Sequence, residues 1–75
     1  MKTFLQFSGY RTNEPCLVDV ADIVLVEPMI DAHSTASPGT VITLRENNQE
    51  LAVKNKYADV VSALSAVSDI RNVPS

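Results

Sequence analysis

The stretch from Gly39 to Leu64 constrains the fold most, because two apolar-alternating segments and a helical pattern follow one another without a gap. Residues 40–45 and 50–54 each alternate between apolar and polar side chains, which is typical of a strand with one buried face. Glu46-Asn47-Asn48-Gln49 separates them, and asparagine accepts positive φ, so a tight hairpin is predicted. The expected inward residues of this hairpin are Ile42, Leu44, Leu51 and Val53.

A helix is predicted directly after the hairpin, over about residues 56–68, with Asn55 as its N-cap. Its apolar stripe recurs at helical spacing and consists of Tyr57, Val60, Val61, Leu64 and Val67. Beside the stripe lies a shallow flank of small residues, among them Ala58, Ser62 and Ser65. Such a flank can approach another backbone closely, so it is a candidate contact with a second copy of the chain.

Three further strands are expected before the hairpin, at residues 3–7, 16–20 and 23–26. The run Ile23–Val26 is continuously apolar, which favours a strand covered on both faces and therefore a central one. Met29 to Pro38 is rich in loop-forming residues and is predicted to be an irregular loop.

The expected fold class is α+β, with about five strands in a small antiparallel sheet or partly rolled barrel and one C-terminal helix. Residues 1–68 are predicted to form a single domain, and residues 69–75 a frayed tail. The expected core consists of Leu5, Phe7, Val18, Ile23, Leu25, Ile42, Leu44, Leu51, Val53, Tyr57, Val60, Val61 and Leu64.

The chain has 75 residues, a length that buries only about 60% of the unfolded surface and leaves a domain marginally stable. Cys16 is its one cysteine and His33 its one histidine, so neither an internal disulfide nor a Cys/His zinc site is expected. Oligomerisation is the remaining common source of stability, and we expect a homo-oligomer, a protein partner or both.

The net charge of −3 disfavours nucleic-acid binding, which depends on clustered Lys and Arg. The alternative stays open through Arg45, Lys54 and Lys56, which could converge on one edge. The sequence has no apolar run of about 20 residues, and its N-terminus, MKTFLQFSGY, has no long apolar core of a signal peptide. We therefore expect a cytoplasmic protein without membrane contact.

No residue pattern indicates catalysis or a cofactor. The acidic residues Asp19, Asp22, Glu27 and Asp31 lack the spacing of a calcium loop, and we interpret them as a solvated strand edge. His33 lies beside serines, but sequence adjacency is not the geometry of a catalytic triad. Cys16 fits a buried structural position.

Four aromatic side chains, Phe4, Phe7, Tyr10 and Tyr57, are interpreted as core phenylalanines and packing tyrosines. An alternative is that Phe4 and Tyr10 form a stacking platform for single-stranded nucleic acid.

The segments "LVDVADIVLVEP", "TVITLRENNQELAVK" and "NKYADVVSAL" resemble in their order the FlbD-like family of short bacterial and phage proteins. The same order is similar to a truncated LytTR-type DNA-binding domain, although the loop here carries Asp31 and no Lys or Arg. The FlbD-like resemblance implies an accessory or regulatory role, and neither resemblance implies an active site.

The leading hypothesis is therefore a small non-catalytic interaction or regulatory module, with no enzyme activity, metal or cofactor. Its expected contact surfaces are the helix flank, the loop and a sheet edge, which could also accept a strand from a partner. The alternatives are a nucleic-acid-binding regulator with a LytTR-like fold and a minor enzyme or metal site.

Overall fold

The computed structural model describes residues 2–29, 39–71 and 73 of the chain. Within them lie the strands β1 (Phe4–Ser8), β2 (Pro15–Asp19), β3 (Ile23–Pro28), β4 (Thr40–Leu44) and β5 (Glu50–Val53), and the helix α1 (Tyr57–Ser65). Two short 3-10 turns, Val20–Asp22 and Glu46–Asn48, follow β2 and β4. The α+β class is therefore confirmed.

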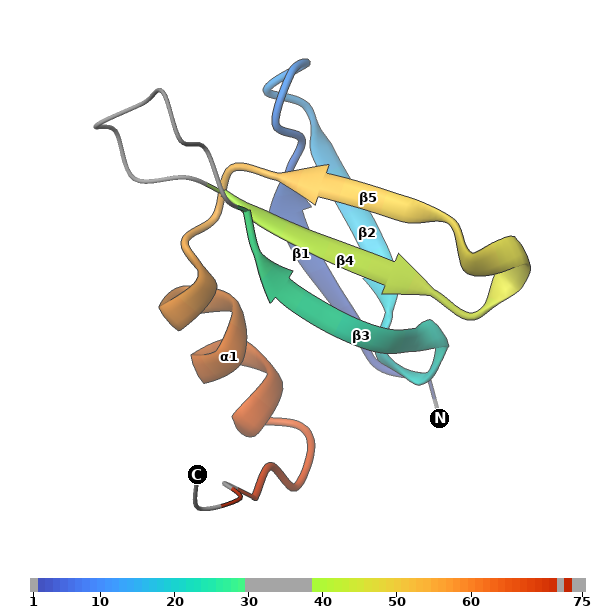
Figure 1. Cartoon of the computed structure of the whole chain (residues 1–75), viewed down its shortest axis with the longest axis vertical. Helices are drawn as coiled ribbons and strands as arrows, with labels where there is room; N and C mark the ends of the chain where they lie inside the picture. The colour runs from blue at the N-terminus through green and yellow to red at the C-terminus, as the bar shows by residue number, and fades with distance from the viewer. Residues whose placement is uncertain (1, 30–38, 72, 74–75) are drawn as a thin grey trace.

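The strands form two antiparallel sheets, β1-β2 and β3-β4-β5, instead of the predicted single sheet, and they do not close into a barrel. The hairpin β1-β2 crosses behind the three-stranded sheet (Figure 1). One corner joins the sheets through a bridge between Gly9 and Val53, with Lys54 N–H donating to Ser8 O over 2.8 Å. At a second corner the turn Val20–Asp22 leads from β2 directly into β3.

The prediction that Ile23–Val26 forms a central strand is wrong, because β3 is an edge strand and β4 is central. The register of β3 shifts between Ile23 and Leu25, where a bulge lies. The bulge turns Leu25 outward, opposite Thr43, and brings Val26 opposite Ile42 in the core. The bulge, and not cover on both faces of the strand, therefore explains why apolar residues follow one another without alternation in β3.

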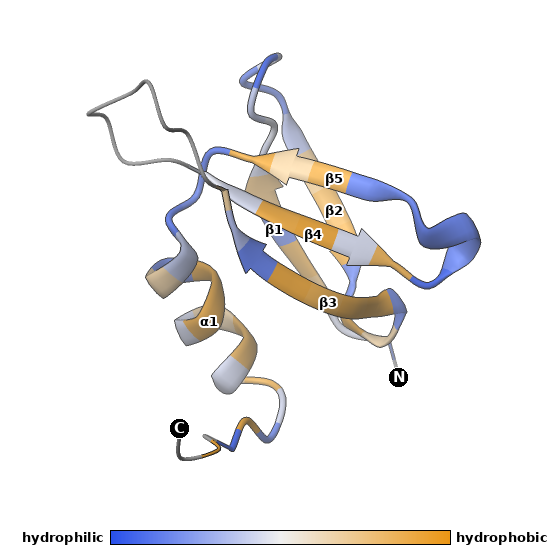
Figure 2. Ribbon diagram, viewed as in Figure 1, coloured by the Kyte–Doolittle hydropathy of each residue, from blue (hydrophilic) through white to orange (hydrophobic). Residues whose placement is uncertain are grey.

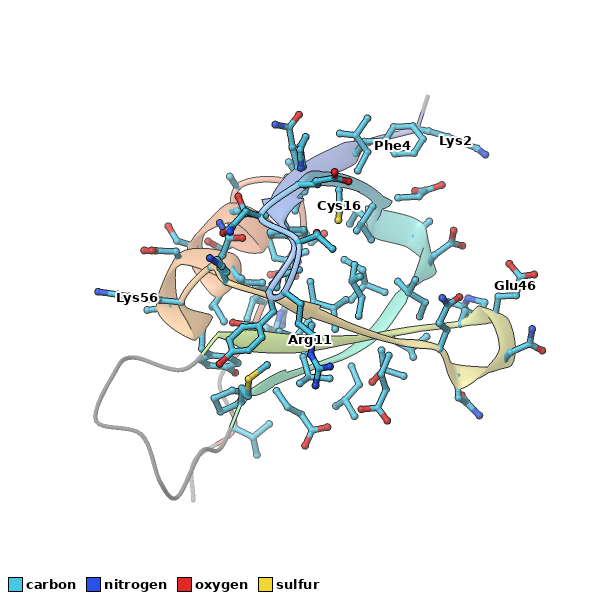
Figure 3. The ribbon with its side chains drawn as sticks, turned by 90° about the horizontal axis from the view of Figure 1, so that it is seen from above. Lys2, Phe4, Arg11, Cys16, Glu46 and Lys56 are labelled. Carbon is cyan, nitrogen blue, oxygen red and sulfur yellow. The ribbon has the colours of Figure 1, made fainter. Side chains whose placement is uncertain are left out.

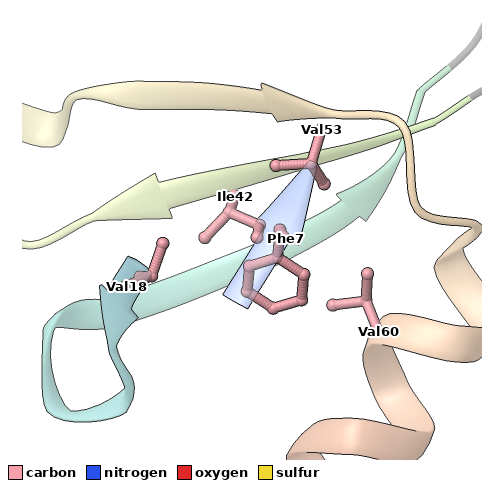
Figure 4. Close-up of a cluster of buried hydrophobic side chains, with 5 residues drawn as sticks. All are labelled: Phe7, Val18, Ile42, Val53 and Val60. Atoms are coloured by element: carbon pink, nitrogen blue, oxygen red, sulfur yellow. The ribbon is translucent and has the colours of Figure 1, made fainter. Parts of the chain in front are cut away.

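The core lies between the two sheets and the helix (Figure 4). Its fully buried apolar side chains are Phe7, Val18, Ile42, Val53 and Val60. Half-buried apolar side chains packed against them are Leu5, Ile23, Val26, Leu44, Leu51 and Leu64. Most of the predicted core is confirmed, but Leu25 and Tyr57 are exposed.

The helix α1 is shorter than predicted and is not capped by Asn55. Lys56 occupies the N-cap position without a side-chain cap bond, and the helix ends at Ser65 instead of near residue 68. Asn55 instead joins the sheets, since its Oδ1 accepts the N–H of Ser8 over 2.9 Å and its carbonyl accepts Thr40 Oγ1–H over 2.7 Å. A residue expected to start the helix therefore stabilises the corner between β1, β4 and β5.

The predicted hairpin turn is confirmed, with φ of 57° at Asn47 and 51° at Asn48. The hydrophilic turn stands out at the end of the β4-β5 hairpin (Figure 2). Of the predicted loop, residues 30–38 lie outside the described residues, and in the predicted tail residues 69–71 and 73 belong to no helix or strand. No helix in the described part of the chain is long and apolar enough to span a membrane.

Candidate interaction groove

Two crossed sheets that are joined at two corners leave two open sides, and α1 covers one of them. Val60 of the helix is fully buried in the core. Leu64 packs against that core and faces β3 residues such as Ile23 and Val26 across a shallow hollow. The helix therefore covers part of the side between β1 and β3, where a hollow of about 400 Å³ remains. The side between β2 and β5 has no helix over it among the described residues.

A groove of about 390 Å³ lies on this second side, and we call it the β2–β5 groove. Its lining residues are Phe4, Cys16, Leu17, Val18, Asp19, Asp22, Leu44 and Leu51. Leu17 faces away from the core and Val18 faces into it, so the groove runs along the outer edge of β2. Leu44 and Leu51 form the opposite wall, from the inner face of the three-stranded sheet.

The groove continues into a second hollow of about 350 Å³ beside the turn between β1 and β2. The two hollows share Cys16 and Leu51, and the second one adds Arg11 and Ala52. Figure 3 shows Cys16 with its sulfur directed between the two sheets and Arg11 near the three-stranded sheet. The combined surface is thus an elongated apolar channel between a hairpin and a sheet.

The two ends of the channel differ in charge. Asp19 and Asp22 lie at one end, and Arg11 lies at the other. Lys2 Nζ is 3.9 Å from an Asp19 carboxylate oxygen, and the other Asp19 oxygen accepts the N–H of Ala21 over 3.0 Å. Asp22 is exposed and forms no ion pair within the described part of the chain. It is therefore the carboxylate more available to a ligand.

Large apolar side chains flank the groove without being covered. Leu17 is 67% exposed and Phe4 is 51% exposed, although both lie in regular strands. They occupy the outer face of the β1-β2 hairpin, where Phe4 pairs with Asp19 and Leu17 with Gln6. Exposed apolar side chains that gather at a hollow are typical of a binding surface.

The predicted convergence of Arg45, Lys54 and Lys56 on one edge is wrong. The strands β4 and β5 are antiparallel, so Arg45, just after β4, lies at the turn end of the hairpin. Lys54 follows β5 at the opposite end, next to Lys56. Figure 3 shows Lys56 and Glu46, the neighbour of Arg45, on opposite sides of the molecule. The Arg45 guanidinium instead donates to the carbonyl of Ala21 over 3.5 Å.

The predicted helix flank does form one exposed surface. Ala58, Ser62 and Ser65 are all exposed on α1, on the side opposite buried Val60. The Ser65 hydroxyl donates to the Ser62 carbonyl over 2.9 Å, one helical turn earlier. The flank is therefore open to a partner, and its role in a dimer stays a prediction.

Residues considered for chemistry are not brought together. Cys16 is half-buried and its thiol donates to the Glu14 carbonyl over 3.7 Å, which fits a structural thiol. His33 and Asp31 lie outside the described residues. Among the residues that the structure does describe, no three His, Cys, Asp or Glu side chains are grouped so that they could hold a metal ion.

The aromatic platform also fails to form, because Phe4 begins β1 while Tyr10 lies beyond its far end. Six residues of extended chain separate their backbones by about 20 Å. The interpretation of Phe4 as a core residue is equally wrong, since only Phe7 is buried. Leu17 was not identified as functional, although its place among polar residues on the outer face of β2 was a usable signal.

Comparison with protein-family models, with curated proteins and with solved structures found no match to this chain. The resemblance to FlbD-like proteins and to LytTR-type domains therefore stays a prediction. Function has to be argued from the geometry of the described residues.

Proposed function

We propose that this domain is a small non-catalytic interaction module that binds a protein partner through the β2–β5 groove. The observation that carries this proposal is the uncovered apolar surface of Phe4 and Leu17 beside a groove walled by Leu44 and Leu51. Exposing large apolar side chains to water is unfavourable by about 25 cal/mol per Å², and a partner that covers them recovers this free energy. The regulatory or accessory role, the cytoplasmic location and a phage origin belong to the same proposal.

The shape of the surface supports a macromolecular partner over a small substrate. The groove is open along the edge of β2, and its polar groups lie at the two ends instead of converging on one point. Small-molecule sites usually bury most of the ligand and converge a few polar groups on it. An elongated apolar channel with charged ends fits a polypeptide better.

The separation of Arg45 from Lys54 and Lys56 removes the cluster on which the nucleic-acid alternative depended. Phosphate binding requires several cationic side chains on one face. We therefore propose no nucleic-acid function, and the nuclease treatment below tests that choice.

The proposal predicts a partner that depends on Leu17 and not on Leu25. Both leucines are exposed in strands, at 67% and 49%, but only Leu17 borders the groove. Affinity capture from a lysate of the native host, treated with nuclease and analysed by mass spectrometry, should recover a protein with the unaltered chain and with Leu25→Ser. Leu17→Ser should lower its recovery at least about fivefold, as expected for an interface residue whose truncation costs about 1 kcal/mol.

Equal recovery with both variants would place the contact outside the groove and contradict the proposal. Loss of all captured protein on nuclease treatment would replace the proposal with the nucleic-acid alternative. Both variants change exposed side chains, so circular dichroism should show unchanged folding.

A further inference from the structure

We infer that the β2–β5 groove binds its partner as an added β-strand, paired with the free edge of β2, and that it selects an extended segment with a basic residue at the Asp19/Asp22 end. This inference rests on the proposed function, since it names the class of partner segment that the same groove takes. Three features of the described residues carry it: the open edge of β2, the apolar walls and the charge at each end.

The strand β2 presents an open hydrogen-bonding edge. Val20 N–H donates to Thr3 O over 2.9 Å and Gly9 N–H donates to Glu14 O over 2.8 Å, which fixes the alternation of the β1-β2 ladder. With the register Phe4↔Asp19, this alternation directs the N–H and C=O of Leu17 away from β1. No hydrogen bond between described residues uses either group of Leu17.

The other strand edges are partly occupied or are modified. At β1, Ser8 N–H donates to Asn55 Oδ1 and Ser8 O accepts from Lys54. At β5, Ala52 O accepts the N–H of Tyr10 over 3.1 Å. Proteins commonly block edge strands with bulges, charges and proline. By the same alternation, Gln6 of β1 and Glu50 of β5 also direct their backbone groups outward, but of these three residues Leu17 alone lines the β2–β5 groove.

The edge of β3 shows this protection most clearly. Its register is broken by the bulge after Ile23, and it ends in Glu27 and Pro28. Met29 N–H points toward β4 and donates to Gly39 O, so the backbone nitrogen of Pro28, one residue earlier, points to the free edge of β3. Because proline has no N–H, this position of the edge offers no donor to an added strand. A strand that adds to this domain therefore finds its partner at β2 and not at β3.

The walls of the groove match the side chains of an added strand. Successive side chains of a strand point to opposite faces. One set of the incoming segment would contact Leu44 and Leu51 inside the groove, and the other would lie beside Leu17 on the outer face. An extended segment with apolar residues on both faces, over about three to five residues, fits this surface.

The charges set the direction of the segment. Antiparallel pairing outnumbers parallel pairing about two- to three-fold, and it places the N-terminal end of the segment beside Asp19, at the end of β2. A lysine or arginine there faces Asp22, and an acidic group at the other end faces Arg11. A second copy of the chain fits less well, because antiparallel pairing through Leu17 sets Asp19 opposite Pro15, which has no N–H to donate.

A short peptide tests this inference directly. The probe has lysine at its amino end, valine alternating with leucine over about five residues, and glutamate at its carboxyl end. Titrated into the ¹⁵N-labelled full chain, it should shift the amide signals of Cys16, Leu17 and Val18 in a saturable way. N-methylation of the central peptide amide, which removes its hydrogen bond to β2, should weaken binding at least about fivefold.

Two controls address the charge preference. A peptide with its lysine and glutamate exchanged should bind about threefold more weakly at low salt, as expected for exposed ion pairs. The variant Asp22→Lys, whose altered side chain is exposed, should remove or reverse this difference. Because N-methylation changes only the peptide, that result does not depend on how any variant folds.

The inference is overturned by the absence of saturable shifts, by shifts confined to β3 or α1, or by binding that N-methylation leaves unchanged. Shifts of the same β2 amides on raising the protein concentration alone would overturn it in favour of self-association. In any of these cases, if the lysate capture still recovers a protein with the unaltered chain and loses it with Leu17→Ser, strand addition fails while the proposed function stands. Loss of that capture is the separate failure of the proposed function.

Discussion

Phe7→Ala is expected to lower the free energy of unfolding by about 3–5 kcal/mol, the usual cost of removing a buried phenylalanine side chain. Phe7 is 3% exposed and lies within the buried cluster that joins β1, β4, β5 and α1 (Figure 4). Chains of this length have a total stability of about 4–11 kcal/mol, so this loss removes a large part of it, and it would unfold the variant at 25 °C if the stability is near the lower end of that range. Urea denaturation followed by circular dichroism measures the effect.

Phe4→Ala is the matched control, since it makes the same change in the same strand. Phe4 is 51% exposed on the opposite face of β1, and its replacement should cost less than about 1 kcal/mol. Equal destabilisation by the two variants would contradict the assignment of the faces of β1. The two variants together therefore test whether Phe7 faces the core and Phe4 faces outward.

Gly39→Ala is expected to destabilise the domain by about 3 kcal/mol, because there is no space for a side chain. A Cβ at Gly39 would lie 1.9 Å from the carbonyl oxygen of Val53 and 3.2 Å from the Tyr10 ring. The obstruction is backbone of β5, and its displacement would disturb the pairing of Thr40 with Val53. The cause is close approach, since the glycine does not have a positive φ.

Gly9→Ala provides the comparison for this prediction. A Cβ at Gly9 would lie 2.7 Å from Thr12 Oγ1, a side-chain atom that can move by rotation about χ1 at the cost of its hydrogen bond from Glu14 N–H. A loss of about 1 kcal/mol is expected. Thermal unfolding of both variants measures this difference. A larger loss of stability for Gly9→Ala than for Gly39→Ala would contradict the close approach of Gly39 to β5.

Local patterns in the sequence predicted the elements of the fold well. Alternation placed Ile42 and Val53 inward and helical spacing placed Val60 inward, and all three are fully buried. The two asparagines of the hairpin turn adopt the expected positive φ. These features depend on residues close in sequence, which is why a single sequence was sufficient for them.

Features that depend on pairing between distant segments were not predicted. The bulge in β3 is set by its register with β4, and it reverses the expected orientation of Leu25 and Val26. Asn55 was expected to cap the helix, but its side-chain oxygen accepts the backbone N–H of Ser8 in β1 instead. In both cases a tertiary contact overrides a local preference.

The β2–β5 groove was not predicted either, because it too depends on contacts between distant segments. It lies between two sheets that are joined only at the bridge between Gly9 and Val53 and at the turn Val20–Asp22, and no local pattern specifies that bridge. The sequence analysis indicated a sheet edge as a contact surface, but it did not identify Leu17. Which edge is open became clear only from the hydrogen bonds of Ser8, Ala52 and Asn55.

The most direct test of the account is the hydrogen exchange of the Leu17 amide, measured by NMR with and without the lysine-first peptide. The neighbouring Val18 amide points into the β1-β2 ladder and serves as an internal reference. Strand addition at β2 should give fast exchange of the Leu17 amide in the free protein and protection at least about tenfold greater when peptide saturates the groove. A Leu17 amide that exchanges equally fast in both states, while Val18 stays protected, would contradict strand addition at β2.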